Sequence, residues 1–143
     1  MSLGNTFETE LLALILNGTA IANIADNAAS GPLTNLYVSL HTGDVGEAGD
    51  QETNEADYTS YDRVAVARTS GGWTVADGAF ENTAEIAFPA ATGGSNTITH
   101  FAIGTAASGA GKVLMKGALG ASRAISSGIT PRFAAGTLNG TLD

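Results

Sequence analysis

The sequence contains no cysteine. This absence excludes disulfides, thiolate metal sites and cysteine nucleophiles, so stability must come from packing or from assembly with other molecules. Basic residues are also scarce: six Lys and Arg stand against fourteen Asp and Glu, which gives a formal charge of -8. Because nucleic-acid binding depends on cations that displace counterions from phosphates, a DNA- or RNA-binding role is not expected.

Long apolar runs are missing as well. No stretch approaches the roughly 20 consecutive apolar residues of a membrane span. Glu8 and Glu10 precede any basic residue, unlike the start of a secretion signal. We therefore expect a soluble protein with no membrane partner. A length of 143 residues predicts a single domain over residues 1–143.

The composition is poor in charge and rich in small residues. Charged residues make up 14% of the chain, well below the roughly 25% of an ordinary soluble domain, and glycine occurs 19 times. A surface of Ala, Gly, Ser and Thr loses little side-chain entropy when it is covered, which suits a protein packed against neighbours. Glycine-rich turns in a β protein account for the same composition equally well.

Residues 1–20 form the one segment with a helical pattern. Asn5 can cap the helix and Glu8 follows three residues later, as in a capping box. Asn17-Gly18 supplies a left-handed stop, and Leu12 and Leu16 widen the apolar surface. One face carries Phe7, Leu11, Leu14 and Ile15. We expect this amphipathic helix to be buried in the protein's own core more readily than in a partner.

Beyond residue 32 the pattern changes from helical to alternating. Leu36, Val38 and Leu40 face one way and the residues between them face the other, which predicts a half-buried strand. Short strands separated by glycine-rich turns predict an antiparallel β-sandwich or jelly-roll-like domain. The further strands are expected at 63–68, 73–75, 84–88, 97–103 and 113–118, with a weaker set from 122 to the C-terminus.

Residues 42–62 hold seven of the fourteen acidic residues and almost no aliphatic ones. A loop of this length is commonly functional, so we predict an exposed acidic loop that forms a contact surface. Calcium binding is the alternative, but the acids do not follow EF-hand spacing, and a solvated loop is favoured. The acids concerned are Asp44, Glu47, Asp50, Glu52, Glu55 and Asp57.

The remaining motifs do not indicate catalysis. Residues 104–112 resemble a phosphate-binding loop, but Ala106 and Val113 occupy the positions of its first Gly and its magnesium-binding hydroxyl. His41 and His100 lie in alternating strands and are expected to be hydrogen-bonded structural residues, although distant residues could still complete a metal site or a triad. Trp73 is expected in the core. We predict no enzymatic activity, cofactor or metal; a small glycan hydrolase with paired carboxylates is a less favoured alternative.

Several short motifs occur in the order found in a group of small tailed-bacteriophage virion proteins. A strand ending in His-Thr leads into an acidic glycine-rich loop, and a Tyr-x-Arg strand follows. Over residues 33–135 the chain resembles this group, whose sequences are often labelled tail-fibre-like. The motifs are LYVSLHTGD at 36–44, GEAG at 46–49, NEA at 54–56, YDRVAV at 61–66, FPAATGG at 88–94 and THFAIG at 99–104.

The resemblance implies a structural virion protein, made in the cytoplasm of the host bacterium. Since the chain is short and lacks repeats, we favour a capsid decoration or cement protein on the capsid exterior that bridges adjacent major capsid subunits and self-associates as a dimer or trimer. A tail-associated, tail-fibre or receptor-binding module is the alternative. The expected interface comprises the helix residues Phe7, Leu11 and Leu14 and the loop residues Asp44, Glu47, Asp50, Glu52, Glu55 and Asp57.

Overall fold

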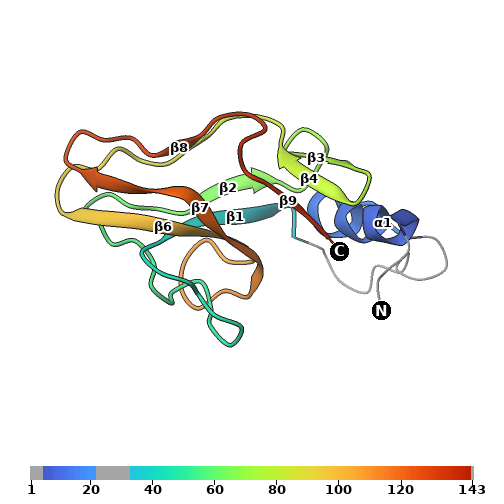
Figure 1. The fold of residues 1–143 in the computed structure, drawn as a ribbon, viewed down its shortest axis with the longest axis horizontal. Helices are drawn as coiled ribbons and strands as arrows, with labels where there is room; N and C mark the ends of the chain where they lie inside the picture. Colours follow the sequence, from blue (N-terminus) through green and yellow to red (C-terminus); the bar gives the residue numbers. More distant parts are fainter. Residues whose placement is uncertain (1–4, 22–32, 143) are drawn as a thin grey trace. The chain divides into compact units, whose positions relative to one another are not determined.

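The computed structural model describes residues 5–21 and 33–142, which form two compact units. The first contains Met1–Asn35, Ala67–Ile86 and Phe133–Asp143, and the second contains Leu36–Val66 and Ala87–Arg132. Neither unit is one continuous stretch of chain. Figure 1 traces the path in sequence colours. The prediction that residues 1–143 make one domain concerns cooperative folding, and it stays a prediction.

The first unit is built from helix α1 (Asn5–Asn17) and a small antiparallel sheet. The sheet has the order β3 (Trp73–Ala76), β4 (Ala79–Asn82), β9 (Asn139–Thr141), and α1 contacts β3 and β4. Leu12, Leu16 and Trp73 are buried between these elements, and the Trp73 ring meets Phe80 edge-on at 6.0 Å between centroids. The predictions of a helix here and of a core tryptophan are confirmed.

The C-terminal end of the helix is set by Gly18 and by Arg68. Gly18 has a φ of +67°, so the helix stops in the left-handed conformation that the sequence predicts. The guanidinium of Arg68 donates to the carbonyl oxygens of Leu14 and Ile15, which have no partner within the helix. Arg68 therefore caps the C-terminal end of α1, and a cation at this end also complements the helix dipole.

The second unit is built on a four-stranded sheet with the order β2 (Val64–Ala67), β1 (Asn35–His41), β6 (Ser95–Gly104), β7 (Val113–Ser126). β1 and β7 each pair antiparallel with β6. A separate pair is formed by β5 (Ile86–Ala87) and β8 (Arg132–Phe133). These sheets confirm the mainly β, antiparallel fold of the β-sandwich class with one short helix. Jelly-roll connectivity stays a prediction.

The strand boundaries differ from the sequence prediction in four places. β4 was not predicted, and the strand expected at 84–88 is reduced to β5. β7 runs eight residues beyond the predicted end at 118, and the weak C-terminal set consists of the end of β7 together with β8 and β9. The reason for the missed β4 is its composition, because AFEN has no β-branched residue.

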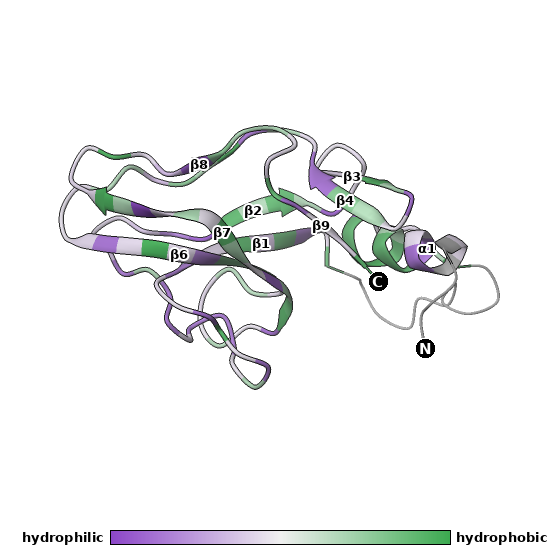
Figure 2. Ribbon diagram, viewed as in Figure 1, coloured by the Kyte–Doolittle hydropathy of each residue, from purple (hydrophilic) through white to green (hydrophobic). Residues whose placement is uncertain are grey.

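The prediction that β1 is half-buried is wrong. Ser39 and His41 belong to the face expected to be exposed, yet both are 0% exposed, as Val38 is on the opposite face. The segment 42–62 folds back against this end of β1, where the Thr53 carbonyl lies 2.9 Å from His41 Nδ1 and the Ala56 N–H donates to the Leu40 carbonyl at 2.8 Å. Figure 2 shows hydrophilic residues recurring along that segment beside the apolar stretches of the strands.

Candidate functional site

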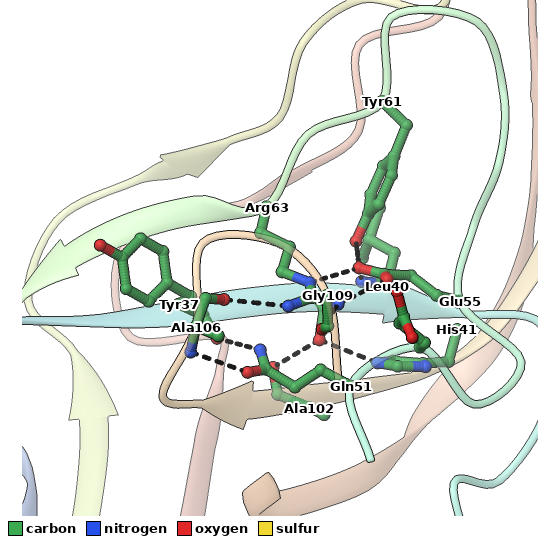
Figure 3. Close-up of polar contacts among 12 residues, drawn as sticks. Tyr37, Leu40, His41, Gln51, Glu55, Tyr61, Arg63, Ala102, Ala106 and Gly109 are labelled. Atoms are coloured by element: carbon green, nitrogen blue, oxygen red, sulfur yellow. Dashed lines mark hydrogen bonds and ion pairs between the residues drawn. The ribbon is translucent and has the colours of Figure 1, made fainter. Parts of the chain in front are cut away.

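The acidic segment 42–62 is held in place by an ion pair between Glu55 and Arg63. The Arg63 Nε atom lies 2.6 Å from Glu55 Oε1, and Arg63 Nη2 lies 2.7 Å from Glu55 Oε2, so the contact is bidentate. The side chains are 2% exposed for Arg63 and 15% for Glu55. Arg63 also donates to the carbonyls of Ala106 and Gly109, at 3.0 and 2.8 Å. One guanidinium thus ties the acidic segment to the 105–112 turn (Figure 3).

Tyr61 connects the ion pair to the sheet. Its hydroxyl donates to Glu55 Oε1 at 2.9 Å and accepts from the backbone N–H of Leu40 in β1 at 3.1 Å. Burial raises the pKa of Tyr61, and the neighbouring Glu55 carboxylate adds to this effect. The hydroxyl therefore stays protonated and donates to the carboxylate at every physiological pH.

Gln51 locks the acidic segment against the 105–112 turn from a second side. Its side chain is 0% exposed and touches the Cα positions of Gly104 and Gly111 so closely that neither has room for a side chain. Gln51 Oε1 accepts from the Ala106 N–H at 3.0 Å. The backbone N–H of Gln51 donates to the Gly111 carbonyl at 3.0 Å. The two glycines are required here because a Cβ would overlap the amide.

His41 secures the middle of the acidic segment. Its Nδ1 lies 2.9 Å from the Thr53 carbonyl, which can only accept, so the neutral ring carries its proton there. The Nε2 atom then accepts from the Ser39 hydroxyl at 2.8 Å. Burial lowers the pKa of His41, although the Thr53 hydrogen bond and the Glu55 charge oppose the shift. His41 is thus a neutral, fully hydrogen-bonded structural residue.

Two loops, 42–62 and 105–112, are therefore fixed to one another and to the sheet. A family model described as podophage GP4 fiber I protein gp80 matches residues 2–141, a range that includes both loops and the sheet. The chain belongs to this fiber protein family. A search of curated proteins finds no match. The resemblance to small phage virion proteins is confirmed at this level: the chain is a structural protein of the phage virion.

The predicted interface residues fall into two groups that differ in exposure. Leu11 and Leu14 are only half-buried on α1, whereas Leu12 and Leu16 carry the burial of the helix in the core. The side chain of Phe7 lies outside the described residues. Whether the helix also meets a partner stays a prediction.

The loop acids divide in the same way. Glu47 and Asp44 are exposed, with side chains 96% and 57% accessible, and both contact Lys116 of β7, at 3.4 and 2.9 Å. The hydrogen bond from the Gly46 N–H, followed by the contact with the Lys116 ammonium, holds the pKa of Asp44 below its usual value. Glu52 and Asp57 are exposed too.

Several predicted loop acids make internal contacts, and among them Asp57 accepts from the Asn96 side chain at 2.8 Å. Asp50 accepts the N–H of Glu52 at 3.0 Å and so stabilises a turn. Glu55 uses both carboxylate oxygens inside the network with Arg63 and Tyr61. The segment is also not exposed along its whole length, as was expected, because some of its residues are buried: Val45, Gln51, Ala56 and Tyr58.

Gln51, Tyr61 and Arg63, which organise the two loops, were not predicted from the sequence to have these roles. One signal was present, because Tyr61 and Arg63 form the Tyr-x-Arg motif of the family resemblance. The role of Gln51 had no local signal, since it depends on two glycines more than 50 residues away.

The hydrogen-bonded residues around His41 are not open to a substrate from solvent. The Ser39–His41 pair has the atoms of a nucleophile and base, but both residues are 0% exposed. Within residues 5–21 and 33–142 no three His, Cys, Asp or Glu side chains gather where they could hold a metal ion. Over the same part of the chain, no helix is long and apolar enough to cross a membrane.

Proposed function

We propose that the protein is a subunit of a fiber on the phage particle and acts by adhesion, without a chemical reaction. The observation that carries this proposal is the match to a fiber protein family over residues 2–141, which takes in both compact units. The match thus concerns nearly the whole chain, and not a segment shared with some larger enzyme.

The rigid arrangement of the loops supports an adhesive role. Binding costs free energy when loops must be ordered at the interface, roughly 0.5–1.5 kcal/mol for each immobilised side chain. In this protein Glu55, Arg63 and Gln51 already fix the loops 42–62 and 105–112 before any partner arrives. A partner would therefore meet a preformed surface.

The charge of that surface suggests the chemistry of the partner. Glu47, Glu52 and Asp57 are exposed on the acidic segment, and the whole chain carries a net charge of -8. We propose that this surface faces a virion protein rich in Lys, Arg or amide groups. Such a contact weakens as salt rises, because screening acts on exposed charges.

Imaging of labelled particles tests the location. Gold-labelled antibody against this chain should mark fibers attached to the particle in negative-stain micrographs. Label spread evenly over the head shell would replace the fiber proposal with capsid decoration, and particles without label would contradict both.

A charge reversal tests the surface. We expect E52K to reduce the amount of this protein in purified virions, because Glu52 is an exposed carboxylate of the acidic segment. E81K, which reverses an exposed charge on β4, is the matched control and should leave the amount unchanged. Equal incorporation of both variants would remove the acidic segment from the interface.

Capsid decoration is the second candidate, and one observation favours it. The sequence has no internal repeat and the first unit contains a packed helix, whereas a fiber shaft is expected to be repetitive. In that role, contacts to several capsid subunits would act together through effective concentration. The imaging experiment above separates the two candidates. Turnover of a capsular polysaccharide by the purified protein would instead favour the glycan hydrolase alternative.

A further inference from the structure

Strand β7 forms an open edge of the sheet in the second unit. In the order β2-β1-β6-β7 it is the last strand, so within this sheet only one of its two edges is hydrogen-bonded, to β6. It is 14 residues long, and residues 118–124 are exposed apart from half-buried Leu119. An unpaired edge of this length offers backbone N–H and C=O groups to another chain.

An irregularity in the β6–β7 pairing brings two cations to one face. Lys116 stands opposite Ala102 and Arg123 stands opposite Ile98, while residues 119–122 form a bulge between them. Directly opposed residues share a face, and Ala102 and Ile98 share a face because they are four residues apart in β6. Lys116 and Arg123 therefore lie on the same face, whereas in a regular strand residues seven apart lie on opposite faces.

The two cations differ in their contacts. Lys116 Nζ lies 2.9 Å from Asp44 Oδ1 and 3.4 Å from Glu47 Oε1, so the acidic segment covers it. Arg123 has no ion pair or side-chain hydrogen bond with any residue in the described part of the chain. Glu47 is 96% exposed and retains carboxylate surface for another cation.

We propose that two copies of the chain associate antiparallel along β7. The proposed register sets Lys116 opposite Arg123 of the second copy, and the bulge at residues 119–122 interrupts the pairing between these two positions. Arg123 of the second copy then lies on the face where Asp44 and Glu47 contact Lys116. The carboxylates of Asp44 and Glu47 thus meet two cations, one from each copy. The twofold axis produces a second, identical cluster.

The middle of the strand has the side chains that close approach requires. The residues in and beside the bulge include Gly117, Ala118, Ala121 and Ser122, which are all small. Net charge opposes association of a chain at -8, but residues 112–126 contain cations and no acid. Along β7, the acids of each copy would therefore meet cations of the other copy. This inference goes beyond the proposed function, because it holds for a fiber subunit and for a capsid decoration protein alike.

Sedimentation equilibrium of the purified chain tests the proposal. The native protein should show a monomer–dimer equilibrium, and R123E and E47K should each weaken the dimer by about tenfold or more. The double variant R123E/E47K restores a balanced cluster and should return the dissociation constant close to the native value. E81K, which makes the charge change of E47K at an exposed acid on β4, is the control and should dimerise as the native chain does.

Hydrogen exchange locates the contact. Amides of residues 118–124 should exchange more slowly as the concentration of native protein rises, and should not slow in R123E. A native chain that stays monomeric at every concentration would overturn the inference, and the bulge and the cations would then protect the edge from pairing. Single variants that dimerise normally, weakening by E81K equal to that of E47K, or a double variant without recovery would also overturn it.

Discussion

Glu55 and Arg63, eight residues apart, form a bidentate ion pair at 2.6 and 2.7 Å that joins the acidic segment to the 105–112 turn. Both residues come from segments without regular structure next to strand β2, and the arginine is nearly inaccessible. The arrangement explains how a segment with seven acids has a defined conformation: one carboxylate is neutralised inside and most of the others remain outside.

Removing one partner of this pair should cost much stability. We expect E55A to lower the free energy of unfolding by about 3 kcal/mol, because it leaves the buried guanidinium of Arg63 without its carboxylate. Urea denaturation followed by circular dichroism measures this. E47A removes an acid that is 96% exposed and should change stability by no more than about 0.5 kcal/mol. Equal effects of the two variants would contradict the structural role of Glu55.

A methyl group at Gly104 or Gly111 should disturb the loops. Each added Cβ would overlap the side chain of Gln51, so we expect G104A and G111A to destabilise the protein by about 1–3 kcal/mol. G120A is the control, because no atom lies within 4 Å of the position its Cβ would take. Thermal unfolding of the three variants makes the comparison. A native melting temperature for G111A would show that Gln51 does not need the space.

Acid should destabilise the protein through His41. Burial lowers the pKa of His41 in the folded state below its value of about 6.5 in the unfolded chain. The unfolded state therefore binds the proton first, and stability present above pH 6.5 is lost as pH falls from 6.5 through the folded-state pKa. Unfolding free energies between pH 7.5 and 5.5 should decrease for the native chain. In H41Q the decrease should be smaller; an identical pH dependence would assign it to other groups.

Arg68 should stabilise the end of the helix. R68A leaves the carbonyls of Leu14 and Ile15 without their donor, and we expect a loss of about 1–2 kcal/mol in unfolding free energy. Helical circular dichroism should also fall. K112A removes an exposed cation and serves as the control. An R68A protein with native stability would mean that solvent caps the helix equally well.

The two compact units should unfold together. Each is assembled from separated stretches of chain, so one unit cannot unfold without releasing segments whose ends lie in the other. We expect a single calorimetric transition in which the calorimetric and van't Hoff enthalpies agree, as for one cooperative domain. E55A in the second unit and R68A in the first should shift that transition without splitting it. Two resolved transitions would contradict the prediction of a single domain.

Local patterns were sufficient for most of the elements. The helix was predictable because Asn5, Glu8 and Gly18 mark its ends and its leucines recur at helical spacing. β1 and β6 were predictable from alternating β-branched and aromatic residues. β4 was not, since its order comes from pairing with β3 and β9 and not from its own propensity.

The loop surface was predictable in position but not in detail. Seven acids within residues 42–62 indicated a functional segment, and Glu47, Glu52 and Asp57 are indeed exposed. Exposure was overestimated for the segment as a whole, because a local pattern cannot reveal that Gln51 finds space beside Gly104 and Gly111. Likewise, nothing near Glu55 indicates that its carboxylate is internal.

By itself, the sequence determined the class of the molecule: a cysteine-free, acidic, mainly β chain with one amphipathic helix and a long acidic segment. These properties depend on composition and short-range spacing, which act within a few residues. Only the tertiary structure decided which acids are buried, which face of β1 is covered and that Lys116 and Arg123 share a face. Those outcomes depend on contacts between residues far apart in the chain and on a bulge whose position no local pattern specifies.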